Sequence, residues 1–172
     1  MSFIKSIKSN GEKIILYKLN EDILNKQILA TTLFTEDINI CFVDLETTGL
    51  NKKEDKIIEI ALKVVKIDKT NGSIVAFNED YASFQDPGQH IDEKITFITG
   101  ITDSMVRGHK IDWDIVNSIV IKSDLVLAHN ASFDRAFLDR YMPISREKIW
   151  TCSASDVDWF QRGFIKKSLE LL

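Results

Sequence analysis

The chain has 172 residues, a hydrophobic fraction of 44%, a charged fraction of 28% and a formal net charge of −4. This length and composition are typical of one globular domain with its own core. No apolar run approaches the ~20 residues of a membrane span, and the first residues lack the long apolar region of a secretory signal. We therefore expect a cytoplasmic protein without a membrane partner.

The mildly acidic charge limits the kinds of nucleic-acid binding that the chain can support. Proteins that grip long duplexes usually present a basic face to the phosphates. If this chain acts on nucleic acid, we expect it to hold a short stretch near an end, with metal ions, a partner or a further segment supplying positive charge. Cys41 and Cys152 lack the spacing of metal ligands and are expected to be free thiols.

The first part of the chain, residues 1–37, is expected to be an N-terminal extension whose role the sequence leaves open. Residues 13–19 could form a short strand, and residues 21–34 have a mixed periodicity that fits a helix or a second strand. Packing across the sheet or contact with a partner are both open roles for this extension, and packing is favoured.

Three strands are predicted next, in an antiparallel meander. Residues 38–45 are apolar and rich in β-branched and aromatic side chains, as in a strand buried on both faces. Residues 51–56 are polar and predict an exposed loop. Residues 57–67 alternate between apolar and polar, and 68–72 end in Asn-Gly, a hairpin signal. Residues 74–84 then form the returning strand.

Short helices are predicted after the meander. The first covers 92–97 and stops at Gly100, and a second begins at Thr102 as its N-cap. Residues 111–122 carry an amphipathic helical stripe. Residues 125–128 are a short apolar strand, which we expect to add parallel to the first strand because it follows a helix.

The last part of the chain is predicted to continue this alternation. Asn130 can cap a helix that runs to about Tyr141, where Met-Pro ends it. Residues 150–160 resemble a strand end and a short helix, and residues 168–172 begin another helix. The whole pattern resembles a ribonuclease H-like α/β fold, with a mixed sheet of three antiparallel strands plus parallel strands, flanked by helices.

Two acids, Asp44 and Glu46, stand at the end of the first core strand. Positions i and i+2 of a strand point to the same face, so these carboxylates repel each other, and a divalent cation with oxygen ligands would relieve the repulsion. A solvated strand end is the alternative. Thr47, Thr48 and Gly49 follow and suit a loop that approaches a ligand closely.

Three segments together resemble the DEDD 3′-5′ exonucleases, in particular the proofreading (epsilon) subunit family of bacterial DNA polymerase III. They read Phe-Val-Asp-Leu-Glu-Thr-Thr-Gly-Leu at 42–50, Thr-Gly-Ile-Thr at 99–102, and Leu-Val-Leu-Ala-His-Asn-Ala-Ser-Phe-Asp at 125–134. The resemblance keeps the family's order and runs from about Ile38 to the chain end. It implies the ribonuclease H-like fold and an exonuclease domain over 38–172.

The resemblance also implies a metal site. In the family, matching acids hold two Mg²⁺ or Mn²⁺ ions, which activate a water and stabilise the displacement at phosphorus. Carried over, Asp44 would bridge both ions, Glu46 would bind the water-activating ion, and Asp134 would act directly or through water. The alternative for Asp134 is a helix-start acid without a ligand, because the helix dipole favours an acid there.

Binding of the 3′-terminal nucleotide is likewise implied by resemblance. Thr47, Thr48 and Gly49 would line its pocket, and the segment at 99–102 that contains Ile101 would border the same cleft. His129 and Asn130 would contact the strand or orient the site. Leu50 would wedge against the terminal base and Phe133 would pack near it, although ordinary core packing is an open alternative for both.

One family feature has no match. The family completes its site with a fourth acid, preceded by a histidine that acts as general base or by a tyrosine in a sister branch. All three histidines, His90, His109 and His129, precede Asp134. We therefore expect the chain to end before this motif, leaving the two-ion site incomplete and the activity of this chain on its own low.

The expected function is a metal-dependent 3′-5′ exonuclease that releases nucleoside monophosphates from single-stranded 3′ ends of nucleic acid, with DNA favoured over RNA. A DNA polymerase subunit is a candidate partner. The alternative is a non-catalytic nucleic-acid or partner-binding module on the same fold. The choice between DNA and RNA, the histidine or tyrosine branch, polymerase association and oligomeric state stay open.

Overall fold

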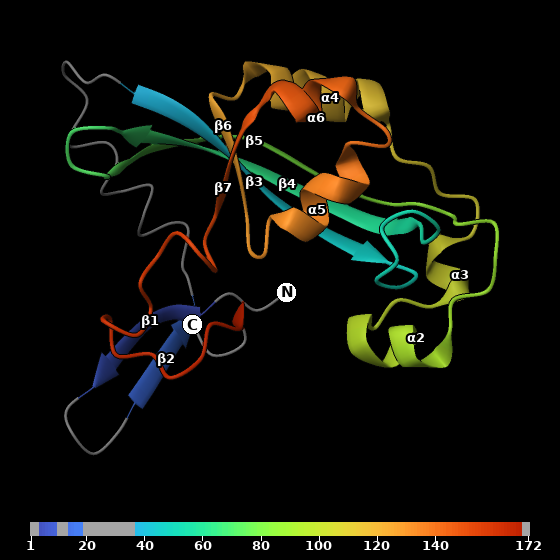
Figure 1. Cartoon of the computed structure of the whole chain (residues 1–172), viewed down its shortest axis with the longest axis horizontal. Helices are drawn as coiled ribbons and strands as arrows, with labels where there is room; N and C mark the ends of the chain where they lie inside the picture. The colour runs from blue at the N-terminus through green and yellow to red at the C-terminus, as the bar shows by residue number, and fades with distance from the viewer. Residues whose placement is uncertain (1–3, 10–13, 19–36, 170–172) are drawn as a thin grey trace.

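One mixed sheet of five strands, in the order β5–β4–β3–β6–β7, forms the centre of the protein (Figure 1). The computed structural model describes residues 4–9, 14–18 and 37–169. The strands of the sheet are β3 (Asp37–Thr47), β4 (Ile57–Asp68), β5 (Ile74–Phe84), β6 (Leu125–Ala128) and β7 (Ile149–Cys152). Within these described segments, no helix is long and apolar enough to span a bilayer.

The strand directions confirm the predicted meander and the parallel addition. β3 pairs antiparallel with β4, which pairs antiparallel with β5, whereas β3–β6 and β6–β7 are parallel. The turn between β4 and β5 is tight. The Gly72 N–H donates to the Asp68 carbonyl over 2.8 Å, and Gly72 has a φ of 74°, a conformation that glycine adopts without a steric cost.

Five short helices belong to the described part of the chain. They are α2 (Glu93–Thr99), α3 (Asp103–Val106), α4 (Trp113–Lys122), α5 (Ser132–Leu138) and α6 (Pro143–Glu147). As predicted, Gly100 ends α2 in the left-handed conformation and Thr102 is the N-cap residue of α3. The Asp112 carboxylate caps α4 by accepting from the backbone N–H groups of Asp114 and Ile115.

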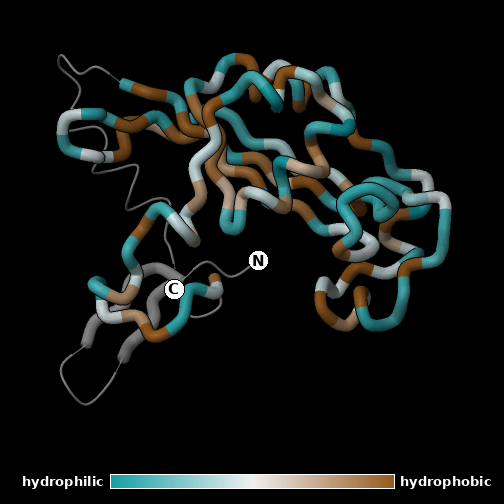
Figure 2. Tube along the Cα trace, viewed as in Figure 1, coloured by the Kyte–Doolittle hydropathy of each residue, from teal (hydrophilic) through white to brown (hydrophobic). Residues whose placement is uncertain are grey.

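Helices α4, α5 and α6 cover one face of the sheet (Figure 1). The core combines Cys41, Val43 and Leu45 of β3 with Val116 and Phe137 of the helices, among others. Figure 2 shows hydrophobic residues along these central strands and hydrophilic residues along the loop between β3 and β4. The helix layer therefore fixes which face of β3 is buried.

The prediction that the first core strand is buried on both faces is wrong. Burial alternates along β3, and Phe42 and Asp44 lie on its more open face, with Phe42 36% exposed. β-branched and aromatic residues occupy both faces of this strand, so its composition does not show which face is buried. The positions of the helices determine which face is covered.

Three further predictions differ from the structure. Asn130 is not a helix cap: Ala131 holds that position, and Asn130 takes a left-handed turn with φ of 64°. The helix ends at Leu138 rather than near Tyr141. Residues 153–160 form turns instead of a short helix. Each difference lies in a turn-rich stretch where side-chain pattern carries little periodic signal.

A second, two-stranded antiparallel sheet lies in the N-terminal part, formed by β1 (Ile4–Ser9) and β2 (Ile14–Lys18). β2 confirms the strand predicted over 13–19, and β1 was not predicted. The predicted helix or strand at 21–34 lies outside the described residues, and most of 168–172 does too. Cys41 and Cys152 are free thiols, as expected. The division at residue 37 stays a prediction.

The helix layer should dominate stability. Phe137 of α5 is 0% exposed, whereas Phe97 of α2 is 91% exposed. We expect Phe137→Ala to lower the free energy of unfolding by about 3–5 kcal/mol, because it leaves a cavity between α5 and the sheet. The matched change Phe97→Ala should alter it by less than about 0.5 kcal/mol. Urea denaturation measures both, and equal losses would contradict the assigned core.

Candidate active site

The first two predicted acids lie on the face of β3 that turns away from the core. Their neighbours Val43 and Leu45 are buried among the helices, so strand alternation directs Asp44 and Glu46 to the opposite face. Asp44 is exposed and Glu46 is half-buried. The sequence thus places two carboxylates side by side because the same strand must bury its other face.

These carboxylates interact with each other and with a third one. Burial, then the charges of Asp44 and Glu59, raise the pKa of Glu46 to about 7. Glu59 of β4 lies directly opposite Glu46 in the sheet, and burial followed by Asp44 raises its pKa as well. Sequence reasoning missed Glu59 as a site neighbour. The register of the β3–β4 pair carries this information, and the sequence alone does not fix that register.

Asp134 joins this group from α5. It lies in the first turn of the helix, as predicted, and it is only 4% exposed. Its pKa is raised to about 7, first by burial and also by the charge of Asp44, against the lowering effect of backbone hydrogen bonds from Asp134 and Leu45. The contact with Leu45 brings the helix start against β3. Residues 90 positions apart in the chain therefore share one electrostatic environment.

The donor chemistry of the site suits a hard cation. Burial raises the pKa of Asp44 and nearby His129 lowers it, whereas burial and two neighbouring carboxylates raise the pKa of Glu46. Carboxylates that repel each other are typical ligands of Mg²⁺, Mn²⁺ or Ca²⁺. In the described ranges, however, no three His, Cys, Asp or Glu side chains are already gathered around one point where an ion could sit. The carboxylates are therefore chemically suited to bind a divalent ion, but their side chains do not converge on one point in this structure.

Both threonines of the loop after β3 form hydrogen bonds within that loop. The Thr47 hydroxyl donates to the Gly49 carbonyl over 2.6 Å, and the Thr48 hydroxyl donates to the Asp55 carboxylate over 2.9 Å. Leu50 at the loop tip is 81% exposed. The core-packing alternative for Leu50 is therefore wrong, whereas the predicted contacts of this loop with a nucleotide stay predictions.

Three of the remaining predicted binding residues, His129, Asn130 and Phe133, lie at the end of β6 and the start of α5. His129 lies at the end of β6, with Nδ1 2.9 Å from the Ser153 hydroxyl and Nε2 2.5 Å from the Lys167 carbonyl. A carbonyl only accepts, so Nε2 carries the proton in this arrangement. Phe133 packs against the core and contacts Phe137 at a ring distance of 4.9 Å. Asn130 is exposed in its turn.

Ile101 differs from the other predicted binding residues because it is 3% exposed and packs with Ile58, Ile91 and Val106. This small core supports the loop before α3. The side chain of Ile101 is therefore covered by its core neighbours, and its contact with a nucleotide stays a prediction.

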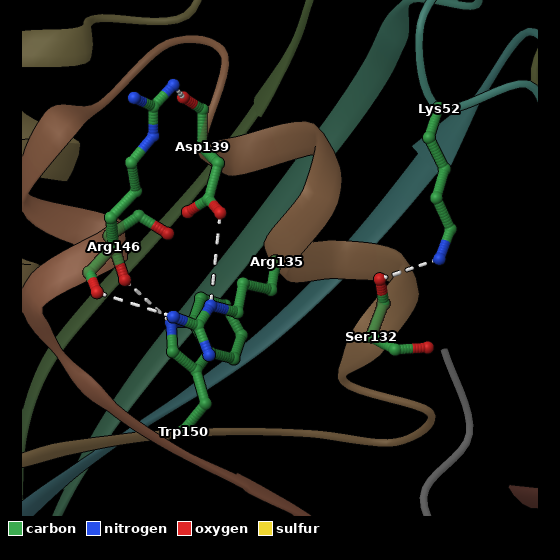
Figure 3. A network of polar contacts seen from close by, with 7 residues as sticks. Lys52, Ser132, Arg135, Asp139, Arg146 and Trp150 are labelled. Carbon is green, nitrogen blue, oxygen red and sulfur yellow. Dashed lines mark hydrogen bonds and ion pairs between the residues drawn. The ribbon is translucent and has the colours of Figure 1, made fainter.

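A network of polar contacts ties the β3–β4 loop and α6 to α5 (Figure 3). Lys52 of the loop donates to the Ser132 carbonyl over 2.9 Å, and Arg146 of α6 donates to the Asp139 carbonyl over 2.8 Å. The Asp139 carboxylate in turn lies 3.9 Å from Arg135. The helix that carries Asp134 is thus held at both of its ends.

Comparison with known proteins agrees with this fold and arrangement. The family model described as exonuclease (RNase_T) matches residues 41–149, and the chain belongs to this family of DEDD 3′-5′ exonucleases. The PolC-type DNA polymerase III of Listeria monocytogenes is 36% identical over 120 residues, 66% of this chain and 8% of that protein. The Bacillus subtilis PolC-type enzyme is 32% identical over 139 residues, 77% of this chain and 9% of that protein. The chain thus spans less than a tenth of the length of these curated relatives.

Solved structures share the fold. An exonuclease I structure matches with a TM-score of 0.58 and 16% identity, covering 78% of this chain and 34% of that one. Exonuclease X in complex with 5′ overhanging duplex DNA matches with a TM-score of 0.54 and 24% identity, covering 77% and 70%. These likenesses confirm the predicted ribonuclease H-like mixed sheet.

The raised pKa of Asp134 predicts how stability depends on pH. A carboxyl group with a higher pKa in the folded protein than in the unfolded chain favours folding while it is protonated. That advantage is lost as the pH rises from the ordinary aspartate range through about 7. Without divalent ions, we expect the free energy of unfolding to fall over this window, and Asp134→Asn to reduce the fall by about 1–3 kcal/mol.

Urea titrations at several pH values in EDTA measure this effect. Asp114→Asn, a change at an exposed acid of α4, is the matched control and should leave the pH profile as in the wild type. An Asp134→Asn profile with the same slope as the wild type would contradict the buried, charge-coupled environment of Asp134.

Proposed function

We propose that this chain provides the metal-dependent hydrolytic site of a 3′-5′ exonuclease that releases nucleoside monophosphates from nucleic-acid ends. One observation carries the proposal: Asp44 and Glu46 lie on the same, open face of β3, and Asp134 shares their electrostatic environment from the start of α5. Membership of the exonuclease family supports the same chemistry.

Each acid has a distinct place in the proposed site. Asp44 is coupled to Glu46 and to Asp134, so it is the residue best placed to be shared between two ions. Glu46 would hold the first ion and Asp134 the second, directly or through water. Bound Mg²⁺ or Mn²⁺ supplies an activated water and neutralises charge at the phosphate. The protein's own task is to keep three carboxylates close despite their repulsion.

A single-stranded 3′ end of DNA is the substrate that we favour. Exonuclease X, which shares the fold, was solved with 5′ overhanging duplex DNA, and the PolC-type relatives are DNA polymerases. The acidic chain, with a net charge of −4, suits a short contact near an end in which the ions offset phosphate charge. Association with a polymerase follows as a proposal from the same relatives.

A second candidate function is a binding module without catalysis. The observation that favours it is that, among the residues with described positions, no three potential ligands surround a common metal position. Such a module would still bind a nucleotide through the loop after β3 and would not hydrolyse the nucleic acid. A nuclease assay with a dead-site control separates the two candidates.

We expect the wild-type chain, in Mn²⁺, to shorten a 5′-labelled single-stranded DNA slowly and stepwise from its 3′ end. Asp44→Ala should lower the rate by about 10²-fold or more, because it removes the carboxylate shared by both proposed ions. Asp114→Ala, which removes an exposed acid of α4, should hydrolyse at the wild-type rate and controls for the loss of one negative charge.

Gel electrophoresis of the labelled products gives both rate and direction. Equal rates for Asp44→Ala and the wild type would show that the hydrolysis comes from elsewhere. A wild type that binds the oligonucleotide and leaves it intact would favour the binding module.

A further inference from the structure

The loop between β3 and β4 is closed at its base by paired backbone and side-chain contacts. The Thr48 N–H donates to the Lys56 carbonyl over 2.8 Å, and the Lys56 N–H donates to the Thr48 hydroxyl oxygen over 3.0 Å. The residues between them therefore form a compact loop that projects from the end of the sheet next to the acids of β3.

The carboxylate of Asp55 fills the inside of this loop. One oxygen accepts from the Thr48 hydroxyl over 2.9 Å, and the other accepts from the Asn51 backbone N–H over 2.8 Å. Thr48 and Asn51 flank Gly49 and Leu50 in the sequence, so one carboxylate fixes both ends of the segment that is predicted to meet the terminal nucleotide. Hydrogen bonds to an ionised carboxylate are the strong kind.

Gly49 is shaped by the same carboxylate. A Cβ atom added to Gly49 would lie 2.5 Å from Oδ2, 2.8 Å from Cγ and 2.9 Å from Oδ1 of Asp55. These are the three nearest heavy atoms, and each distance is shorter than real Cβ contacts. Asp55 cannot move aside without losing its bonds to Thr48 and Asn51. The glycine is therefore required by the close approach to Asp55.

The loop is also fixed to the helix that carries Asp134. Arg140, just after α5, donates to the backbone carbonyls of Asp55 over 2.6 Å and of Lys52 over 3.1 Å. Lys52 reaches back to the Ser132 carbonyl at the start of α5 (Figure 3). The loop that holds Leu50 and the helix that holds Asp134 are thus one connected unit.

Asp55 acts separately from the metal-binding acids. Among the described residues, the hydrogen bonds of its carboxylate do not reach Asp44, Glu46 or Asp134. Its contacts go to Thr48 and Asn51, on either side of the loop tip. Removal of its carboxylate should therefore affect the loop and leave the affinity for the metal ions largely unchanged.

The geometry points to Asp55 as a positioning residue that holds the 47–51 loop in shape to receive the terminal nucleotide of the substrate. This inference rests on the proposed exonuclease function and extends it to a residue outside the predicted site. Asp55 touches neither the reacting phosphate nor the ions in this account. It acts through Thr48, Gly49 and the backbone of Asn51.

Thymidine 5′-monophosphate, a product of the proposed reaction, is a suitable probe because no hydrolysis follows its binding. We expect Asp55→Ala to weaken its binding about tenfold or more, since two charge-assisted hydrogen bonds of the loop are lost. Asp55→Asn keeps one acceptor oxygen and should recover part of the affinity. Asp114→Ala, at an exposed acid of α4 outside the loop, should bind the nucleotide as the wild type does.

Calorimetry of each variant with the nucleotide, with and without Mn²⁺, and with Mn²⁺ alone separates the outcomes. Weaker nucleotide binding by Asp55→Ala with wild-type Mn²⁺ affinity supports the inference. Equal nucleotide binding by Asp55→Ala and the wild type overturns it and leaves the exonuclease proposal intact. Failure of the wild type to bind the nucleotide in either condition overturns the positioning role, whereas failure to bind Mn²⁺ alone counts against the proposed hydrolytic function.

A double-variant comparison guards against loss of folding. Gly49→Ala should lower the melting temperature in the wild-type background, where the new methyl group collides with the Asp55 carboxylate. In the Asp55→Ala background the same change should lower it much less, because the colliding atoms are gone. An equal loss in both backgrounds would show that Asp55 does not shape the loop around Gly49, and would overturn the inference.

Discussion

The repulsion among carboxylates at the end of β3 is the constraint on which the rest of the site depends. Asp44, Glu46 and Asp134 share a partly buried environment in which the charge of Asp44 disfavours the ionisation of Glu46 and of Asp134. A fold that served stability alone would separate or neutralise them. This fold keeps them together, and the repulsion that remains between them is the physical reason to infer a cation.

The architecture supplies the forces that oppose this repulsion. Val43 and Leu45 anchor β3 in the core that α4, α5 and α6 cover, so Asp44 cannot turn away without unburying them. Phe137 anchors α5 in the same core three residues after Asp134. Each acid is thus held in place by a hydrophobic neighbour on its own element. Burial of apolar surface, together with the polar contacts at both ends of α5, keeps the charges close.

Much of this arrangement could be predicted from the sequence, because the relevant signals are local. Alternation over 57–67 and the Asn-Gly turn placed β4 and β5 correctly, and the acids at 44 and 46 carried the metal hypothesis. The features that were missed depend on contacts between distant residues. Glu59 becomes a site neighbour only through the strand register, and the role of Asp55 appears only when the loop closes.

The buried face of β3 and the first residue of α5 also could not be predicted from local sequence signals. The strand looked buried on both faces because Phe42 and Val43 are equally apolar, yet the helices cover only the side of Val43. Asn130 resembled a helix cap by residue type, whereas the chain uses it for a left-handed turn before Ala131. Asparagine suits both positions, so residue type alone could not decide.

The position at which a divalent ion binds distinguishes a metal site at the end of β3 from one elsewhere on the protein. Mn²⁺ is paramagnetic and broadens the NMR signals of nearby backbone amides, so substoichiometric Mn²⁺ maps its own site. We expect the amide signals of Asp44, Glu46 and Asp134 to broaden first, and Asp44→Ala to abolish this effect. Broadening that leaves these signals intact and concentrates elsewhere, for example around Asp86 and Asp103, would contradict a metal site at the end of β3.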